Sequence, residues 1–246
     1  MISEQAKIWN KEYQTKSFMS GTKPQKSVVK FAKGLKKVRR ELVNRGELEE
    51  SNFSGLKVLD LGCGEGKNAL YFAERGAQVV GIDISHVAIL NAQNHASEEG
   101  LSHVTEFSVG SMGEVLPYVD ESFDIVLDVT SSNALSTPER NVYLSEAHRV
   151  LKSGGKLFVR ALCKDGDANA KQLLKESPSH ERDTYIMPVS GLVERVFTRD
   201  DIMTIYSEYF AIESIEKETH YTQMQAKSGE KKKFKRNFWI LQIHKE

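Results

Sequence analysis

The sequence predicts a doubly wound α/β fold, in which helices cover both faces of a mostly parallel sheet. Three observations lead to this prediction. Residues 57–85 have the pattern of an apolar strand, a glycine-rich turn, a helix and a second apolar strand. Segments of helix and strand character continue to alternate as far as residue 162. Two further apolar segments, 210–219 and 238–243, flank a lysine-rich stretch and indicate a terminal hairpin.

Length and composition fit one soluble domain with additions. The 246 residues are 39% hydrophobic and 28% charged, and the formal net charge of zero gives no overall field that would favour nucleic acid. No apolar run approaches the ~18 residues of a membrane span, and the N-terminus lacks the apolar centre of a signal peptide. Cys63 and Cys163 show no metal or redox spacing, so two reduced thiols in a cytoplasmic protein are expected.

Residues 1–50 precede the first predicted strand and are expected to form an N-terminal helical extension. Trp9 and Tyr13 are four residues apart and would share a helix face. That face either docks the helix or serves as a lid over a pocket. From Pro24 the spacing predicts a second helix, apolar on one face and rich in lysine and arginine on the other. The basic face is either simply solvated or a surface for phosphates.

The strand–helix–strand unit at residues 57–85 has the features of a nucleoside site. Glycines at 62, 64 and 66 lie where strand meets helix, and glycine permits positive φ and a close approach of ligand to backbone. The helix N-terminus presents free N–H groups and partial positive charge. Asp83 ends the second strand 17 residues (83 − 66) after the last glycine, where an acid accepts hydrogen bonds from ribose hydroxyls.

Glycine spacing separates two classes of cofactor. A dinucleotide fingerprint, G-x-G-x-x-G, would place its third glycine at position 67, which is Lys67. Asp60 also precedes the turn. VLDLGCGEG followed by VVGIDIS resembles motif I and the acidic motif that follows it in class I S-adenosylmethionine (SAM) methyltransferases. The resemblance implies SAM as cofactor and S-adenosylhomocysteine (SAH) as product. A nucleotide oxidoreductase, or a SAM-binding protein without turnover, is the alternative class.

Later elements extend the resemblance over about residues 55–246. Ser85 is a good N-cap for the next helix, and Ser136 with Glu139 forms a predicted capping box. Segments 104–109, 122–130, 156–162, 210–219 and 238–243 are the third to seventh predicted strands. The resemblance implies a Rossmann-like, seven-stranded sheet in the order 3-2-1-4-5-7-6, with the last strand antiparallel.

Two domains of unequal size are expected. Residues 1–50 form the N-terminal helical extension, which resembles the short helix that covers the SAM site in similar small-molecule methyltransferases. Residues 51–246 form the methyltransferase domain. Within it, residues 163–197 interrupt the alternation of helix and strand and are too long for an ordinary connector. They are expected to be an insertion after strand five that covers the substrate.

The resemblance implies cofactor contacts at the carboxyl ends of the first four strands. Ser111 stands where the family has an acid for the adenine amino group, and its hydroxyl can still accept that bond. Met112 either lies against the adenine ring or is an ordinary core residue. Asp128 either faces the methionyl part of SAM or the substrate, or caps its own loop. The expected cofactor residues are Asp60, Gly62, Cys63, Gly64, Asn68, Asp83, Ile84, Ser111, Met112 and Asp128.

Substrate contacts are expected from the N-terminal aromatics and from polar residues at the later strands. The arginines among them either bind an acidic substrate or form structural salt bridges. The catalytic candidates are Tyr13, Asn133 and Arg160, and the substrate-binding candidates are Tyr13, Phe18, Asn133, Arg160, Arg195, His220 and Arg236. Asp165, Asp167 and His180 lack the spacing of metal ligands, so no metal is expected.

The predicted function is transfer of a methyl group from SAM to a small molecule. GCGEGKNALYFAERGAQVVGIDIS resembles the tellurite-resistance and thiopurine-type branch of small-molecule methyltransferases. DVTSSNAL stands where amino-methylating nucleic-acid enzymes carry an N/D-P-P-Y/F tetrapeptide. The alternative is an RNA or protein methyltransferase that uses the basic helix and the lysine-rich hairpin. No membrane partner is expected, and no motif specifies the acceptor or the oligomeric state.

Overall fold

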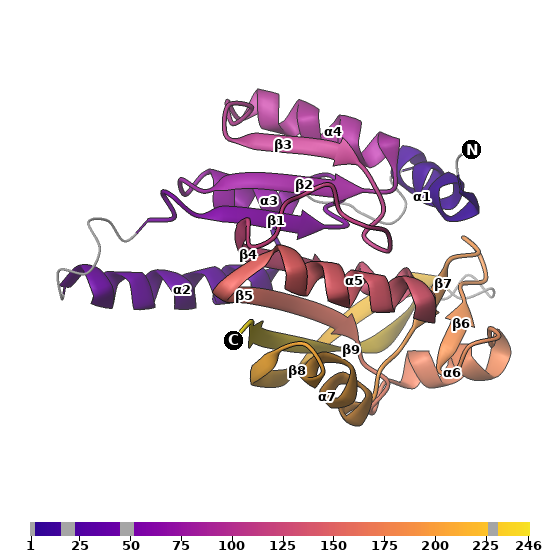
Figure 1. The fold of residues 1–246 in the computed structure, drawn as a ribbon. Helices are drawn as coiled ribbons and strands as arrows, with labels where there is room; N and C mark the ends of the chain where they lie inside the picture. Colours follow the sequence, from indigo (N-terminus) through magenta and orange to yellow (C-terminus); the bar gives the residue numbers. More distant parts are fainter. Residues whose placement is uncertain (1–2, 16–22, 45–51, 226–230) are drawn as a thin grey trace.

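The frame of the protein is a seven-stranded sheet, seen in a computed structural model that describes residues 3–15, 23–44, 52–225 and 231–246 (Figure 1). The sheet has the order β3-β2-β1-β4-β5-β9-β8. Its strands are β1 (Lys57–Leu61), β2 (Gln78–Asp83), β3 (Thr105–Val109), β4 (Phe123–Val129), β5 (Leu151–Leu162), β8 (Ala211–Gln225) and β9 (Lys231–His244). β8 and β9 are the sixth and seventh strands of the sheet, so the predicted order 3-2-1-4-5-7-6 is confirmed.

Strand directions also match the prediction. β1 pairs in parallel with β2 and β4, β2 with β3, and β4 with β5. β9 is antiparallel to both β5 and β8. Parallel neighbours need a crossover connection, usually a helix, whereas antiparallel neighbours can be joined by a hairpin. The alternating first part of the sequence and its hairpin-like end therefore produce the two halves of one sheet.

Helices cover the sheet from both sides. On one face lie α2 (Lys26–Asn44), α3 (Lys67–Ala73) and α4 (His86–Glu98), and on the other lie α5 (Thr137–Val150) and α7 (Arg199–Ser207). The rings of Phe31 in α2 and Phe158 in β5 are 5.0 Å apart in the first layer. Tyr143 of α5 and Ile202 of α7 are fully buried in the second. Each burial of this kind stabilises the fold by about 1.5–3 kcal/mol.

Helix starts follow the capping rules. The Thr198 hydroxyl accepts a bond from the Asp201 N–H (3.1 Å), and Asp201 in turn accepts one from the Thr198 N–H (2.9 Å). Glu139 accepts the corresponding bond from the Ser136 N–H (2.8 Å), as the predicted capping box requires. Each N-cap contributes about 1 kcal/mol, so α5 and α7 begin at fixed residues beside the carboxyl edge of the sheet.

Two segments gather at the carboxyl ends of the parallel strands (Figure 1). One is α1 (Glu4–Thr15), which comes before the rest of the fold in sequence. The other lies within the predicted insertion and consists of α6 (Ala168–Glu176) and a two-stranded sheet of β6 (Thr184–Ile186) and β7 (Val193–Arg195). The insertion therefore has regular structure of its own and stands beside the edge where open α/β sheets bind ligands.

Strand lengths depart from the sequence prediction. β5 begins at Leu151 rather than Lys156, directly after α5, and the β4–β5 pairing shifts register between Phe123 and Ile125. β8 and β9 are also longer than the predicted segments 210–219 and 238–243. Their pairing with each other starts at Ala211–His244 and continues to Gln225–Lys231. No helix in the described ranges is long and apolar enough to span a bilayer.

Candidate active site

The glycine turn between β1 and α3 approaches the loop after β4 very closely. Gly62, Gly64 and Gly66 have φ angles of 69°, 55° and 80°. A Cβ on Gly62 would lie 2.4 Å from both Cβ and Oγ of Ser131. The Ser131 hydroxyl also donates a hydrogen bond to the Gly62 carbonyl (3.1 Å). Glycine is therefore required at position 62 both by its backbone angle and by the contact with this loop.

Asp83 is held rigidly at the end of β2. One carboxylate oxygen accepts a hydrogen bond from the Gly64 N–H (2.9 Å), and the other accepts one from the Ser85 N–H (2.8 Å). Burial raises the pKa of Asp83 to about 6 although both bonds oppose the shift. Each oxygen keeps a free lone pair, so the fixed carboxylate can accept further hydrogen bonds from a ligand.

Asp60, at the carboxyl end of β1, has a carboxylate oxygen that lacks a hydrogen-bond partner within the described ranges. Only 1% of the residue is exposed, and its Oδ2 atom has no hydrogen-bond partner among the described residues. Burial first, and then the charge of Asp83, raise the pKa of Asp60 to about 7. Buried polar atoms in proteins are almost always paired. This carboxylate therefore indicates a place for a cationic or hydrogen-bonding group from outside the chain.

Helix α1 lies across this site. The Asn10 side-chain oxygen accepts a bond from the Ser85 hydroxyl (2.7 Å), and the Gln5 amide donates one to the Ala134 carbonyl (3.2 Å). The helix thus joins the start of α4 to the loop after β4. Tyr13 is 6% exposed, and burial followed by the charge of Asp83 raises the pKa of its phenol. Tyr13 is thus buried near the acids of the site, and the role of α1 as a lid stays a prediction.

Other residues expected at the cofactor site lie around the same turn. Cys63 is buried, and burial and the charges of Asp83 and Asp60 raise the pKa of its thiol. Ile84 is half-buried, and Met112 is buried in a cluster with Leu61 and Ile82.

Two expected cofactor residues already hold bonds within the protein. The Ser111 hydroxyl accepts a bond from the Gly113 N–H (3.1 Å). The Asn68 side chain accepts one from the Gln25 N–H (3.0 Å) just before α2. Asn68 thus connects the glycine turn to the N-terminal extension.

Asp128 caps its own loop, and its contact with SAM or the substrate stays a prediction. It is fully buried. One of its carboxylate oxygens accepts bonds from the Ser131 N–H (3.2 Å) and Ser132 N–H (3.1 Å), and the other accepts one from the Tyr143 hydroxyl (3.0 Å). With three protein donors, Asp128 shapes the loop that contacts the glycine turn.

Asn133 lies in the short 3₁₀ helix η1 (Ser132–Ala134) after β4. Its side-chain oxygen accepts a bond from the Leu162 N–H at the end of β5 (2.9 Å). Its buried Nδ2 has no partner within the described part of the chain. Asn133 therefore fixes the ends of β4 and β5 relative to each other and keeps one donor available.

Arg160, His220 and Arg236 form one group around β5, β8 and β9. Arg160 is 5% exposed, stacks on the Phe238 ring at 3.4 Å and lies 3.6 Å from Glu218. Burial lowers the pKa of Arg160 to about 10. His220 Nε2 lies 2.7 Å from the same Glu218.

Arg236 completes this group from β9. It donates a bond to the Tyr185 hydroxyl (3.2 Å) and lies 3.9 Å from Asp167. Arg160 and Arg236 thus each have a carboxylate close by. This arrangement favours structural salt bridges over binding of an acidic substrate. Arg195, in β7, is separate from this group and lies near η1. Phe18 lies outside the described residues.

Sequence reasoning missed two residues, Asn10 and Arg140. Arg140 is 3% exposed and lies on the buried face of α5 with Tyr143, Leu144 and Ala147. A charged residue in phase with an apolar helical stripe is the signal that could have revealed it. Asn10 carries no such signal, because only its contact with α4 distinguishes it from other polar residues of α1.

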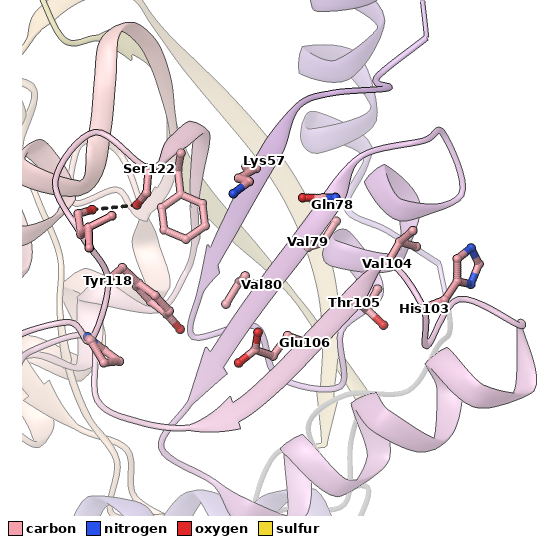
Figure 2. Close-up of a pocket in the computed structure, with 13 residues that line it drawn as sticks. Lys57, Gln78, Val79, Val80, His103, Val104, Thr105, Glu106, Tyr118 and Ser122 are labelled. Carbon is pink, nitrogen blue, oxygen red and sulfur yellow. Dashed lines mark hydrogen bonds between the residues drawn. The ribbon is translucent and has the colours of Figure 1, made fainter.

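A separate hollow lies at the opposite edge of the sheet. It has a volume of about 480 Å³ and is lined by residues at the starts of β1, β2 and β3, such as Lys57, Gln78 and Glu106, and by Tyr118 (Figure 2). Ligands of open α/β sheets bind at the carboxyl ends of the strands, so this hollow is not the candidate active site. Within the described ranges no three His, Cys, Asp or Glu side chains form a metal site.

Fold and site together define a methyltransferase. The sequence profile of the family described as "Methyltransferase domain" matches residues 52–236, which is 185 (236 − 52 + 1) of the 246 residues. The chain therefore belongs to this family, and the family expected from the motifs is confirmed.

Individual relatives share shorter stretches. The chain is 36% identical over 107 residues to the methyltransferase GfsG of Streptomyces halstedii, covering 43% of this chain and 37% of that protein. It is 37% identical over 102 residues to the 2-heptyl-1-hydroxyquinolin-4(1H)-one methyltransferase of Mycobacteroides abscessus, covering 42% of this chain and 44% of that protein. The chain therefore matches less than half the length of these two curated relatives.

Solved structures share the fold. TehB from Haemophilus influenzae superposes with a TM-score of 0.62 over 97% of this chain and 67% of that one, at 17% sequence identity. At this identity the similarity shows a common fold. The Rossmann-like fold predicted from the sequence is thus confirmed independently of the family match.

Proposed function

We propose that the protein transfers a methyl group from SAM to a small-molecule acceptor. The observation that carries this proposal is the pair of buried acids at the glycine turn. Asp83 is fixed by two backbone N–H groups, and Asp60 presents an unpartnered oxygen beside it. SAM has a ribose, which suits the first acid, and two cationic groups, which suit the second.

The described residues fit SAM around this pair. Asp83 would accept bonds from the ribose hydroxyls, and the Gly62–Gly64 backbone would lie against the ligand because no side chain intervenes. Asp60 would favour the cationic end of the cofactor. The remaining residues proposed to line the site are Cys63, Asn68, Ile84, Ser111 and Met112. When bound, SAM supplies a methyl group that its sulfonium activates for in-line transfer.

The chain's own contribution is to position the acceptor and exclude water. Alignment of two reactants in a near-attack geometry lowers a barrier by as much as ~7–11 kcal/mol. Among the catalytic candidates, Tyr13 has a raised pKa and is a neutral phenol at pH 7. Asn133 does not titrate, and Arg160, with a pKa of about 10, is a cation. None of the three is a base at neutral pH, so we propose that they orient an acceptor that is already nucleophilic.

A small acceptor is favoured over RNA or protein by the position of the basic helix. α2 carries exposed lysines such as Lys33, Lys36 and Lys37 but extends toward the edge of the sheet opposite to α1 and the insertion (Figure 1). The basic face of α2 therefore leads away from the acids at the glycine turn (Figure 1). A small acceptor is also the kind named for the quinolone methyltransferase relative.

Substitution of Asp83 by Asn tests the proposed cofactor site. Asp83→Asn should weaken SAH binding at least tenfold in calorimetry, because a charged acceptor of two ribose bonds is lost. Asp120→Asn is the matched control, because Asp120 is a surface residue paired with Arg149 far from the turn. The folded state of each variant is checked by circular dichroism. A folded Asp83→Asn protein with unchanged SAH affinity would refute the assignment.

A further inference from the structure

Two arginines lie close together beside η1. They are separate from the group of Arg160, His220 and Arg236 around β5, β8 and β9. Arg140 belongs to α5 and Arg195 to β7. Their guanidinium carbons lie 5.3 Å and 5.1 Å from the centre of the same ring, that of Phe197. Burial and the charge of Arg195 both lower the pKa of Arg140. The two positive charges are thus held close together where they are largely buried. Opposite charge and hydrogen bonds are needed to offset the cost of burying them.

The protein leaves much of their hydrogen-bonding capacity unused. Arg140 Nη2 donates to the carbonyls of Ser132 and Leu135. Its Nε and Nη1 atoms, and Nε of Arg195, are buried without a partner in the described part of the chain. Over the same residues, no carboxylate lies within the 4.0 Å of an ion pair from either arginine. A pair that served only to hold η1 would not require these three free donors.

Acids in the neighbourhood are already engaged. Glu181 accepts bonds from the Thr137 backbone and hydroxyl (3.1 Å and 2.7 Å). Asp201 caps α7 through Thr198, and Asp128 caps the loop after β4. Glu181, Asp201 and Asp128 offset part of the positive charge from a distance, but none of them forms an ion pair with either arginine among the described residues. Guanidinium groups of this kind favour carboxylate and phosphate oxygens.

The arginine pair lies on the substrate side of the proposed cofactor site. Arg140 bonds to Ser132, whose neighbour Ser131 touches Gly62 of the glycine turn. β7, which carries Arg195, packs against η1. Arg195 also lines an open cleft of about 660 Å³ between β7 and the start of α7, which connects the pair to solvent. A group held here would stand close to the loop after β4, which contacts the glycine turn.

We propose that Arg140 and Arg195 bind an oxyanion, carboxylate or phosphate, carried by the methyl acceptor. This inference rests on the proposed methyltransferase function and makes the acceptor an acidic small molecule. Arg140 would be the buried anchor, and Arg195 would be the gate reached first from the open cleft. The pair would select acceptors by charge and would take no part in the transfer itself.

Matched probes test the proposal. Protein saturated with SAH is titrated in a calorimeter with benzoate, phenyl phosphate and benzamide, which share a ring and differ in the charged group. At least one of the two anions should bind tenfold or more tightly than neutral benzamide. Which anion binds better shows whether the natural group is a carboxylate or a phosphate. Equal binding of all three probes, or binding of none, would overturn the proposal.

Variants assign the effect to the arginines. Arg195→Gln, at a partly exposed position, should reduce the affinity for the anion relative to benzamide tenfold or more and leave SAH affinity unchanged. Arg195→Lys should restore part of this anion preference. Arg140→Gln should act in the same way if its melting temperature shows that it folds. Arg40→Gln, on the exposed far part of α2, is the charge-matched control. Unchanged anion preference in Arg195→Gln would contradict this inference alone, whereas absence of SAH binding to the wild type would contradict the proposed function.

Discussion

Asp60 and Asp83 are both buried beside the glycine turn, yet the protein satisfies them differently. Asp83 receives two backbone N–H groups, whereas one oxygen of Asp60 has no partner among the described residues. An unmade bond at a buried carboxylate costs about 1–3 kcal/mol or more. The ligand-free fold therefore carries a local instability at Asp60, which a cationic ligand would relieve. Titratable groups with strongly perturbed pKa values, such as Asp60, cluster at functional sites.

The pH dependence of stability tests the state of Asp60. Its pKa is about 7 in the folded protein but about 3.9 in an unfolded chain, so the folded state holds the proton more tightly between these values. The contribution of Asp60 to stability is therefore fully present below about pH 4 and is lost as pH rises through 7.

Asp60→Asn removes this titration. The melting temperature of the ligand-free variant should increasingly exceed that of the wild type as pH rises from 5 to 8, measured by thermal unfolding. Melting curves for the two proteins that shift in parallel with pH would show that Asp60 is ionised throughout.

At the scale of elements, the site is assembled by contacts between loops rather than by any single motif. The β1–α3 turn packs on the loop after β4 through Gly62 and Ser131. α1 is joined to the loop after β4 by Gln5 and to the start of α4 by Asn10. Sequence patterns identified the turn, because glycine spacing is local. They did not decide whether Tyr13 docks its helix or covers a pocket, because its environment is formed by residues about 50 to 70 positions away.

Two glycine-to-alanine substitutions test the packing of the turn. Gly62→Ala should destabilise the fold and weaken SAH binding at least tenfold, because φ is +69° and the new methyl would meet Ser131 at 2.4 Å. Gly34→Ala is the matched control, because no atom lies within 4 Å of its Cβ position in α2. It should stabilise the protein by about 0.5–1 kcal/mol. Urea unfolding measures both changes, and a Gly62→Ala protein as stable as Gly34→Ala would contradict the close contact.

For the whole molecule, the sequence was sufficient to predict the sheet but not the substrate side of the site. Buried apolar runs and glycine turns determine parallel strands locally, and the strand order followed from the family resemblance. The extra length of β8 and β9 and the order within residues 163–197 depend on cross-strand pairing between distant segments, which a single sequence does not display. The position of Arg140 on the apolar stripe of α5 could have marked it as buried, but its proximity to Arg195 in another element could not be read from the sequence.

The central claim is that the carboxyl edge of this sheet binds SAM. Calorimetric titration of the full chain with SAM and, separately, with NAD tests it directly, because the glycine spacing and the two acids distinguish these cofactors. We expect SAM to bind with a stoichiometry of one and NAD to give no measurable heat. Binding of NAD without binding of SAM would contradict the claim and would place the protein among nucleotide-dependent oxidoreductases.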